Sequence, residues 1–143
     1  MDMRLKFLSD NMRAIDFGML STRTEGGAFA SRPMSNNGEV DYDGNSYFFT
    51  YDQARTVADI EGDTSVGLTF TGTPGPHGQP PLFIAVQGNA ELIRDKAMFA
   101  AHWTAGLDHW FEQGVDTPGL VMIRVRAARI HYWNGADQGE IVL

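Results

Sequence analysis

The sequence predicts a mainly β protein whose strands form an antiparallel barrel with flanking helices. Short segments with strand signals follow one another along the chain, and consecutive pairs are joined by links of hairpin length. Helical patterns lie between groups of strands, so the regular βα alternation that builds a parallel sheet is missing. The 143 residues suit a single domain, because a chain of this length buries roughly 68–70% of its unfolded surface in one core.

The first part of the chain predicts a helix and two hairpins. Apolar residues recur at helical spacing over residues 3–15. Strands are expected over 17–24 and 28–34, joined by a three-residue turn with two glycines, and a second pair is expected over 40–42 and 46–51 around an Asp-Gly turn. Glycine tolerates the positive φ that such turns require.

The middle of the chain predicts a short helix and two longer strands. Residues 52–61 fit an amphipathic helix whose first amides Asp52 can cap. Strands are expected over 66–71 and 82–93, with a bulge or bend at Gly88. The ten residues between these strands include four Pro and three Gly, which suits an exposed loop.

The last third of the chain predicts helical residues and one more strand. Aromatic and aliphatic residues at helical spacing indicate a helix over 95–114 with one break around Gly106. A strand is expected over 120–133, followed by a short tail from Asn134. The expected order is therefore one helix, four strands, a short helix, two strands, helical residues and a final strand.

Charge and composition narrow the classes of partner. Eleven Lys and Arg against eighteen Asp and Glu give a formal net charge of −7, the opposite of the basic surface used by nucleic-acid-binding proteins. The chain has no Cys, so disulfides and thiolate metal ligands are excluded. Charges interrupt the apolar residues near the N-terminus, so we expect no signal peptide, no membrane span and a cytoplasmic location.

Arginine residues at the ends of adjacent elements predict an anion site. Ser31-Arg32-Pro33-Met34 ends a strand, and Arg55 falls in the first turn of the helix that follows the next strands. Guanidinium groups bind phosphate through paired hydrogen bonds, and a helix N-terminus adds backbone amides. The pattern favours a phosphomonoester ligand, with an ordinary ion pair or a solvated arginine as the alternative.

The other reactive residue types predict neither a metal site nor a nucleophile. Of the four His, only His102 and His109 have a plausible spacing, and no carboxylate cluster accompanies them. Ser21 and Ser31 have no base close by in the sequence. We therefore expect no metal and assign no catalytic residue.

A series of short motifs follows a recognisable order. The motifs are Met19-Leu20-Ser21-Thr22, Ser31-Arg32-Pro33-Met34, Tyr47-Phe48-Phe49-Thr50, Trp110-Phe111 before Gly114, and His131-Tyr132-Trp133. Together, over about residues 5–134, they resemble the general-stress-protein branch of the pyridoxamine 5′-phosphate oxidase-like family. Two positions differ: Arg55 stands where relatives often have Lys, and Glu112 stands where many have Pro.

This resemblance implies an antiparallel split β-barrel of Greek-key topology, in which two identical chains hold FMN, or sometimes FAD, in clefts at their interface. Carried onto this sequence, it implies that Arg32 and Arg55 bind the flavin phosphate. The residues expected along the ribityl chain and ring are Ser31, Pro33, Met34, Phe49 and Thr50. The aromatic residues that could form a further wall are Trp103, Trp110, Phe111 and Trp133, for which core packing is the alternative.

Three functions remain open at this point. The first is a flavin-dependent oxidoreductase linked to the stress response, and the second is a non-catalytic protein that stores, senses or buffers flavin. The third is a purely structural barrel. A homodimer is expected because the chain has more large aromatic surface than one small barrel hides. Little pyridoxamine phosphate oxidase activity is expected, because residues 134–143 carry two carboxylates and no Arg.

Overall fold

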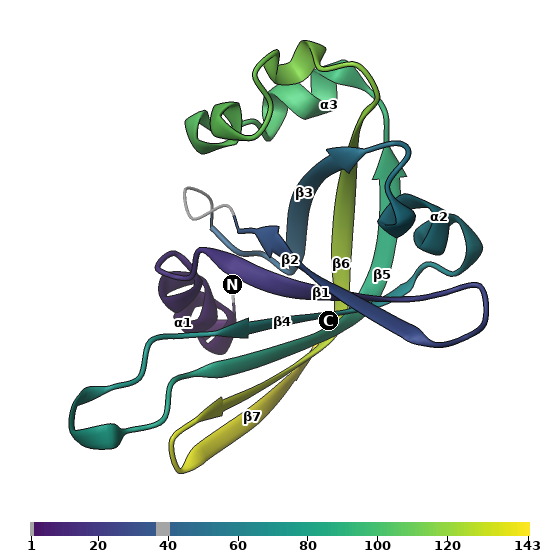
Figure 1. The fold of residues 1–143 in the computed structure, drawn as a ribbon. Coiled ribbons are helices and arrows are strands. Elements are labelled where there is room, and N and C mark those ends of the chain that lie inside the picture. The colour runs from purple at the N-terminus through teal and green to yellow at the C-terminus, as the bar shows by residue number, and fades with distance from the viewer. Residues whose placement is uncertain (1, 37–40) are drawn as a thin grey trace.

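Seven strands of the described residues form one antiparallel sheet that curls into a half-barrel (Figure 1). The structure is a computed structural model that describes residues 2–36 and 41–143. Its strands are β1 (Phe17–Arg23), β2 (Phe29–Ser35), β3 (Asn45–Tyr51), β4 (Ser65–Thr71), β5 (Phe83–Ile93), β6 (Leu120–Asn134) and β7 (Asp137–Val142). Its α-helices are α1 (Met3–Met12), α2 (Arg55–Gly62) and α3 (Lys96–Ala101), and its 3-10 helices are η1 (Pro76–Gly78), η2 (Ala105–His109) and η3 (Gly114–Asp116). None of these helices has the length and apolar composition needed to cross a membrane.

The strand order shows why the barrel is split. Neighbouring strands run β2-β1-β4-β5-β6-β3, and β7 also pairs with β6. Because β4, β5 and β6 are consecutive and β3 lies beside β6, these four strands form a Greek key. In the part of the chain that the structure describes, no pairing joins β2 to β3, so the sheet ends at these two edges. The predicted antiparallel split barrel with flanking helices is confirmed.

Strand β6 is long because it pairs with two strands along the same edge. β3 pairs with residues 120–126 and β7 with residues 129–134. Opposite the gap between them, β5 has the predicted irregularity, a register shift between Gln87 and Gly88. A Cβ at Gly88 would overlap the carbonyl oxygen of Arg126, so glycine allows the two backbones to approach here.

The end of the chain differs from the expected short tail. Residues Asp137–Val142 form β7, which follows a turn where Gly135 has a φ of 64°. Only Ile141 of this strand is buried, and its partner across the ladder is the buried Ile130. The strand therefore has one apolar anchor among polar residues, which explains why its sequence did not show the usual alternation.

Two further local expectations are wrong. The short strand expected over 40–42 is not formed, since Asp41 and Tyr42 have no regular structure, and Val40 lies outside the described residues. Asp52 does not cap α2, which begins after Ala54 without a side-chain cap. Instead the Asp52 carboxylate pairs with Arg94, 2.7 Å away, because the chain first makes a turn after β3.

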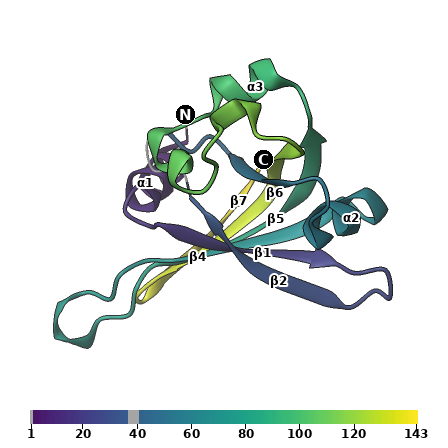
Figure 2. The same cartoon turned by 45° about the horizontal axis from the view of Figure 1, so that its top comes forward.

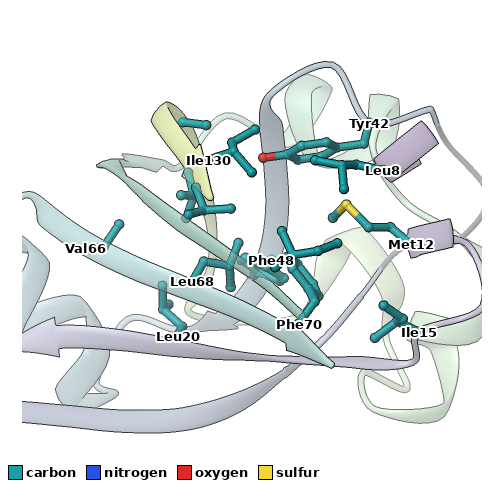
Figure 3. Packing of buried hydrophobic residues seen from close by; sticks show 14 of the residues in the cluster. Leu8, Met12, Ile15, Leu20, Tyr42, Phe48, Val66, Leu68, Phe70 and Ile130 are labelled. Atoms are coloured by element: carbon teal, nitrogen blue, oxygen red, sulfur yellow. The ribbon is translucent and has the colours of Figure 1, made fainter. Parts of the chain in front are cut away.

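The main core fills the inside of the curled sheet (Figure 3). Alternate residues of β4, among them Leu68 and Phe70, point inward and are buried, as expected for a strand with one face on the core. Helix α1 closes one side with Leu8 and Met12, which point toward these strands. Phe48 of β3 completes this contact from the opposite edge of the sheet.

A second apolar cluster covers the other face of β3 and β6. Phe49 and Met122 from the strands meet Phe99 and Phe111 from the helical residues. These helical residues were expected as one broken helix over 95–114, and they form α3 followed by η2 and η3 at the top of Figure 1. The segment between α3 and β6 thus forms a cover beside the opening of the barrel.

A candidate ligand cleft between the two edge strands

The opening between β2 and β3 forms a cleft of about 540 Å³. This volume falls in the range of small-molecule pockets, roughly 300–1,000 Å³. One wall comes from β2, the facing wall from β3 and the start of α2, and the segment around η2 covers it. The residues that line it are Phe17, Arg32, Pro33, Met34, Ser35, Asn36, Tyr47, Phe48, Phe49, Thr50, Thr56, His102, Thr104, Gly106, Leu107, Trp110 and Phe111.

Arg32 places a positive charge in this cleft. Its guanidinium donates a hydrogen bond to the hydroxyl of Thr22 on β1, 2.8 Å away, and approaches the carboxylate of Asp59 on α2 at 3.6 Å. Burial is the main cause that lowers the pKa of Arg32, and Asp59 acts against it. The group keeps its charge at neutral pH because arginine titrates far above it. Arg32 is therefore held from one side, and its unused N–H groups can bind a ligand.

Arg55 lines a neighbouring groove instead of the cleft. It is the first residue of α2, and the next residue, Thr56, does line the cleft. The positive charge of Arg55 contributes to the lowered pKa of Arg32, so the two guanidinium groups are close enough to interact. Asp59, which contacts Arg32, lines the groove together with Arg55. Of the two arginines predicted for one phosphate, Arg32 thus lines the cleft and Arg55 lines the groove.

Most of the other residues predicted along the ligand line the cleft. Those in its walls are Pro33, Met34, Phe49 and Thr50. Ser31 is not among them. Its hydroxyl hydrogen-bonds the hydroxyl of Ser21 on β1, 2.7 Å away.

The predicted aromatic residues separate into three places. Trp110 and Phe111 line the cleft, and Trp110 is 57% exposed. Trp103 packs against the second apolar cluster. Core packing was the alternative given for this residue in the sequence analysis. Trp133 lies near the end of β6, outside the cleft of its own chain, where its ring stacks on His131 with 4.2 Å between centroids.

Ten of the residues that line the cleft were not predicted as site residues, and two of these, Tyr47 and His102, form a stacked pair. The rings of Tyr47 and His102 stack with 3.7 Å between centroids. Burial, followed by the positive charge of Arg124, lowers the pKa of His102, while Asp43 acts against this shift. The lowered pKa favours the neutral form of His102, which has one donor and one acceptor nitrogen. Tyr47 begins the motif that was quoted for the resemblance, but its contact with His102 depends on tertiary structure.

The composition of the cleft suits a flat organic anion. Its walls are mostly aromatic and aliphatic, and Arg32 is the charged side chain among the described residues that line it. A flat ring system can pack on such walls, and a phosphate can bind the guanidinium. Residues 2–36 and 41–143 contain no group of three or more His, Asp or Glu arranged to hold a metal ion.

These features define a split β-barrel protein with an arginine-bearing cleft between its edge strands. In a comparison with known families, the family described as pyridoxamine 5′-phosphate oxidase like matches residues 4–143. The chain belongs to this family. The family predicted from the order of short motifs is therefore confirmed.

Individual relatives are similar at low sequence identity. Protein bli-3 of Neurospora crassa is 25% identical over 146 residues, which cover 92% of this chain and 65% of that protein, so the chain spans less than two thirds of this relative. A crystal structure of a Clostridium acetobutylicum protein related to general stress protein 26 matches with a TM-score of 0.80 and 18% identity, over 100% of this chain and 97% of that one. A heme binding protein from Mycobacterium smegmatis matches with a TM-score of 0.76 and 14% identity, over 96% of this chain and 57% of that one. The structural matches support the fold.

Proposed function

We propose that this protein binds FMN in the cleft between β2 and β3, with the flavin phosphate at Arg32. Arg32 carries the proposal, because its guanidinium is held by Thr22 and Asp59 in a cleft whose other walls are largely apolar. A hydrogen bond between charged groups contributes about 1.5–3 kcal/mol. Trp110 and Phe111 offer aromatic surface for a flat ring. Membership of the pyridoxamine 5′-phosphate oxidase-like family supports this choice of ligand.

Titration of the flavin-free protein with FMN and with riboflavin tests this proposal. Riboflavin has the same ring and ribityl chain but no phosphate, so it serves as the matched control ligand. We expect FMN to bind at least about tenfold more tightly, the ratio that corresponds to 1.4 kcal/mol. Equal affinities would contradict a phosphate site at Arg32, and the absence of binding by both ligands would contradict a flavin protein.

The bound flavin would supply the redox chemistry, while the protein binds, orients and shields it. The proposed activity is that of a flavin-dependent oxidoreductase linked to stress, which the general stress protein 26 relationship of the Clostridium acetobutylicum neighbour supports. The alternative is a flavin-binding protein without catalysis. Stopped-flow mixing of the flavin-loaded protein with NADH or NADPH separates the two: rapid bleaching of the flavin supports an enzyme, and an unchanged spectrum with many donors supports the binding protein.

A homodimer is part of the same proposal. The outer face of the sheet presents the exposed side chains of Phe17, Met19 and Phe83 among small and polar residues such as Gly67, Thr69 and Ala85. Exposed apolar side chains among small residues allow a second sheet to approach closely, and a two-fold interface uses the same patch twice. Light scattering should give a mass near twice the 15.8 kDa of one chain. A stable monomer that binds flavin in a 1:1 ratio would contradict a cleft shared by two chains.

Heme is a second candidate ligand, and His102 is the observation that favours it. Neutral imidazole is a common ligand of heme iron, and the ring of His102 lines the cleft with a lowered pKa. The Mycobacterium smegmatis neighbour is named a heme binding protein. Titration with hemin distinguishes the candidates: a sharp Soret band that is lost in the His102→Ala variant supports heme, and displacement of weakly bound hemin by FMN supports flavin.

A further inference from the structure

The cleft between β2 and β3 has two different ends. At one end, Arg32 approaches the carboxylate of Asp59 on α2 at 3.6 Å. At the other end, the side-chain amide of Asn36 donates hydrogen bonds to the carbonyl oxygens of Met12 and Ile15, at 2.9 and 2.8 Å, where α1 ends. Helices α1 and α2 lie on opposite sides of the barrel (Figure 2), so these contacts mark the two ends of the cleft.

Tyr47 and His102 belong to the same end of the cleft as Asn36. Tyr47 lines a small adjacent hollow together with Asn36, and its ring stacks on that of His102. Because a strand rises about 3.3 Å per residue, Tyr47 lies about 10 Å from Thr50, near the end of β3 that leads to α2. Asn36, Tyr47 and His102 are named here the polar end of the cleft, in contrast to the charged end at Arg32.

Asn36 and His102 offer hydrogen-bonding groups that the described part of the chain leaves unused. Both N–H groups of the Asn36 amide are occupied by backbone carbonyl oxygens, which leaves its oxygen Oδ1 as an acceptor. The ring nitrogens of His102 have no hydrogen-bond partner among the described residues. Burial and then the positive charge of Arg124 lower the pKa of His102, against the effect of Asp43, and the neutral ring offers one donor and one acceptor.

These groups match one edge of a flavin ring and not the other. The pyrimidine edge carries a carbonyl group, an N–H group and a second carbonyl group, so it can donate to Asn36 and accept from His102. The opposite edge carries two methyl groups. If that edge filled the polar end, it would exclude water from Asn36 and His102 without replacing their hydrogen bonds, which is unfavourable.

We propose that the polar end recognises the pyrimidine edge of the flavin ring and that His102 is the residue that determines this specificity. The ring then extends away from Arg32 with its pyrimidine edge at Asn36 and His102. The stack with Tyr47, at 3.7 Å between centroids, holds the plane of the imidazole and so directs its hydrogen bonds. This inference rests on the proposed flavin function and concerns the orientation of the ring.

Equilibrium titration of the flavin-free protein with lumiflavin, and with lumiflavin methylated on the pyrimidine N–H, tests the proposal. Both ligands lack the ribityl phosphate, and they differ only at the edge in question. We expect the native protein to bind lumiflavin at least about tenfold more tightly than the methylated ligand. His102→Ala should reduce this ratio to about threefold or less, and His102→Gln, which keeps a donor and an acceptor, should restore most of it. His77→Ala is the matched control, since His77 is exposed in the loop between β4 and β5 and does not line the cleft.

The ratio separates recognition from a structural role, because a variant that only disturbs the cleft weakens both ligands alike. His102→Ala should also raise the dissociation constants of FMN and riboflavin by the same factor, whereas Arg32→Ala should act on FMN. Equal affinities for the two lumiflavins in the native protein, or an unchanged ratio in His102→Ala, would overturn the assignment of His102, and FMN binding in the same preparation would leave the proposed function standing. Failure of the native protein to bind any of these flavins would overturn both.

Discussion

Replacement of Arg32 by Ala gives the sharpest test of the cleft, because two effects of this residue can be measured separately. The first effect is on folding. Arg32→Ala leaves the Asp59 carboxylate, which is 7% exposed, with the hydroxyl of Thr22 at 2.7 Å as its remaining side-chain partner. A buried polar group that loses a partner costs about 1–3 kcal/mol. The larger cost of about 3–5 kcal/mol for a fully buried ion pair does not apply, because Arg32 is only partly buried.

The second effect is on ligand binding. Loss of a charged hydrogen bond to phosphate should cost about 1.5–3 kcal/mol, which corresponds to a rise in the FMN dissociation constant of roughly 10- to 150-fold. Urea unfolding, followed by tryptophan fluorescence, measures the first effect, and FMN titration measures the second. Riboflavin affinity should change little, because riboflavin lacks the phosphate.

A double-mutant cycle with Asp59→Asn separates the two effects. The Asn side chain removes the buried charge while it retains a hydrogen-bonding partner for Thr22, so Arg32→Ala should cost less stability in this background. The loss of FMN affinity should persist, because it depends on Arg32 itself. An FMN dissociation constant within about twofold of the native value in Arg32→Ala would refute the phosphate site.

The remaining predictions concern the sheet, the cleft, the interface and the reaction. Gly88→Ala should lower the free energy of unfolding by about 1–3 kcal/mol, because the new methyl group overlaps the carbonyl of Arg126; an unchanged urea midpoint would argue against this close approach. Burial lowers the pKa of His102 in the folded state, so the unfolded chain takes up the proton first as the pH falls below about 6.5, and stability should fall through this window. The His102→Gln variant should lose less folding stability between pH 7 and pH 5 than the native protein. An identical loss of stability would show that His102 does not cause this pH dependence. Met19→Glu should shift the mass in light scattering from dimer toward monomer, whereas Lys6→Glu, an exposed change on α1, should not. Pyridoxamine phosphate oxidation should be slow, and a kcat near or above about 1 s⁻¹ would show this expectation to be wrong.

The elements with local signals were predictable from the sequence. The hairpin of β1 and β2 has its turn glycine, Gly27, at a φ of 82°, and the bulge at Gly88 is where a glycine interrupts a long strand pattern. β7 was missed because an edge strand with one buried residue has little periodicity. The cap by Asp52 was wrong because a competing partner, Arg94, lies 42 residues away in the sequence.

The sequence by itself determined that the protein is an antiparallel β-barrel with an anion site. The barrel follows from strand patterns joined by short turns, and the anion site follows from an Arg in a strand and a second Arg at the start of a helix. Only the tertiary structure decided which residues share a hollow. Curling of the sheet brings the edges β2 and β3 to face each other across the cleft, although 9 residues separate Ser35 from Asn45 along the chain and no strand pairing joins them in the described residues. The buried Asp59 on α2 pairs with Arg32, which lines the cleft, whereas Arg55 lines the neighbouring groove. This arrangement depends on burial and charge between elements distant in sequence, which local patterns do not encode.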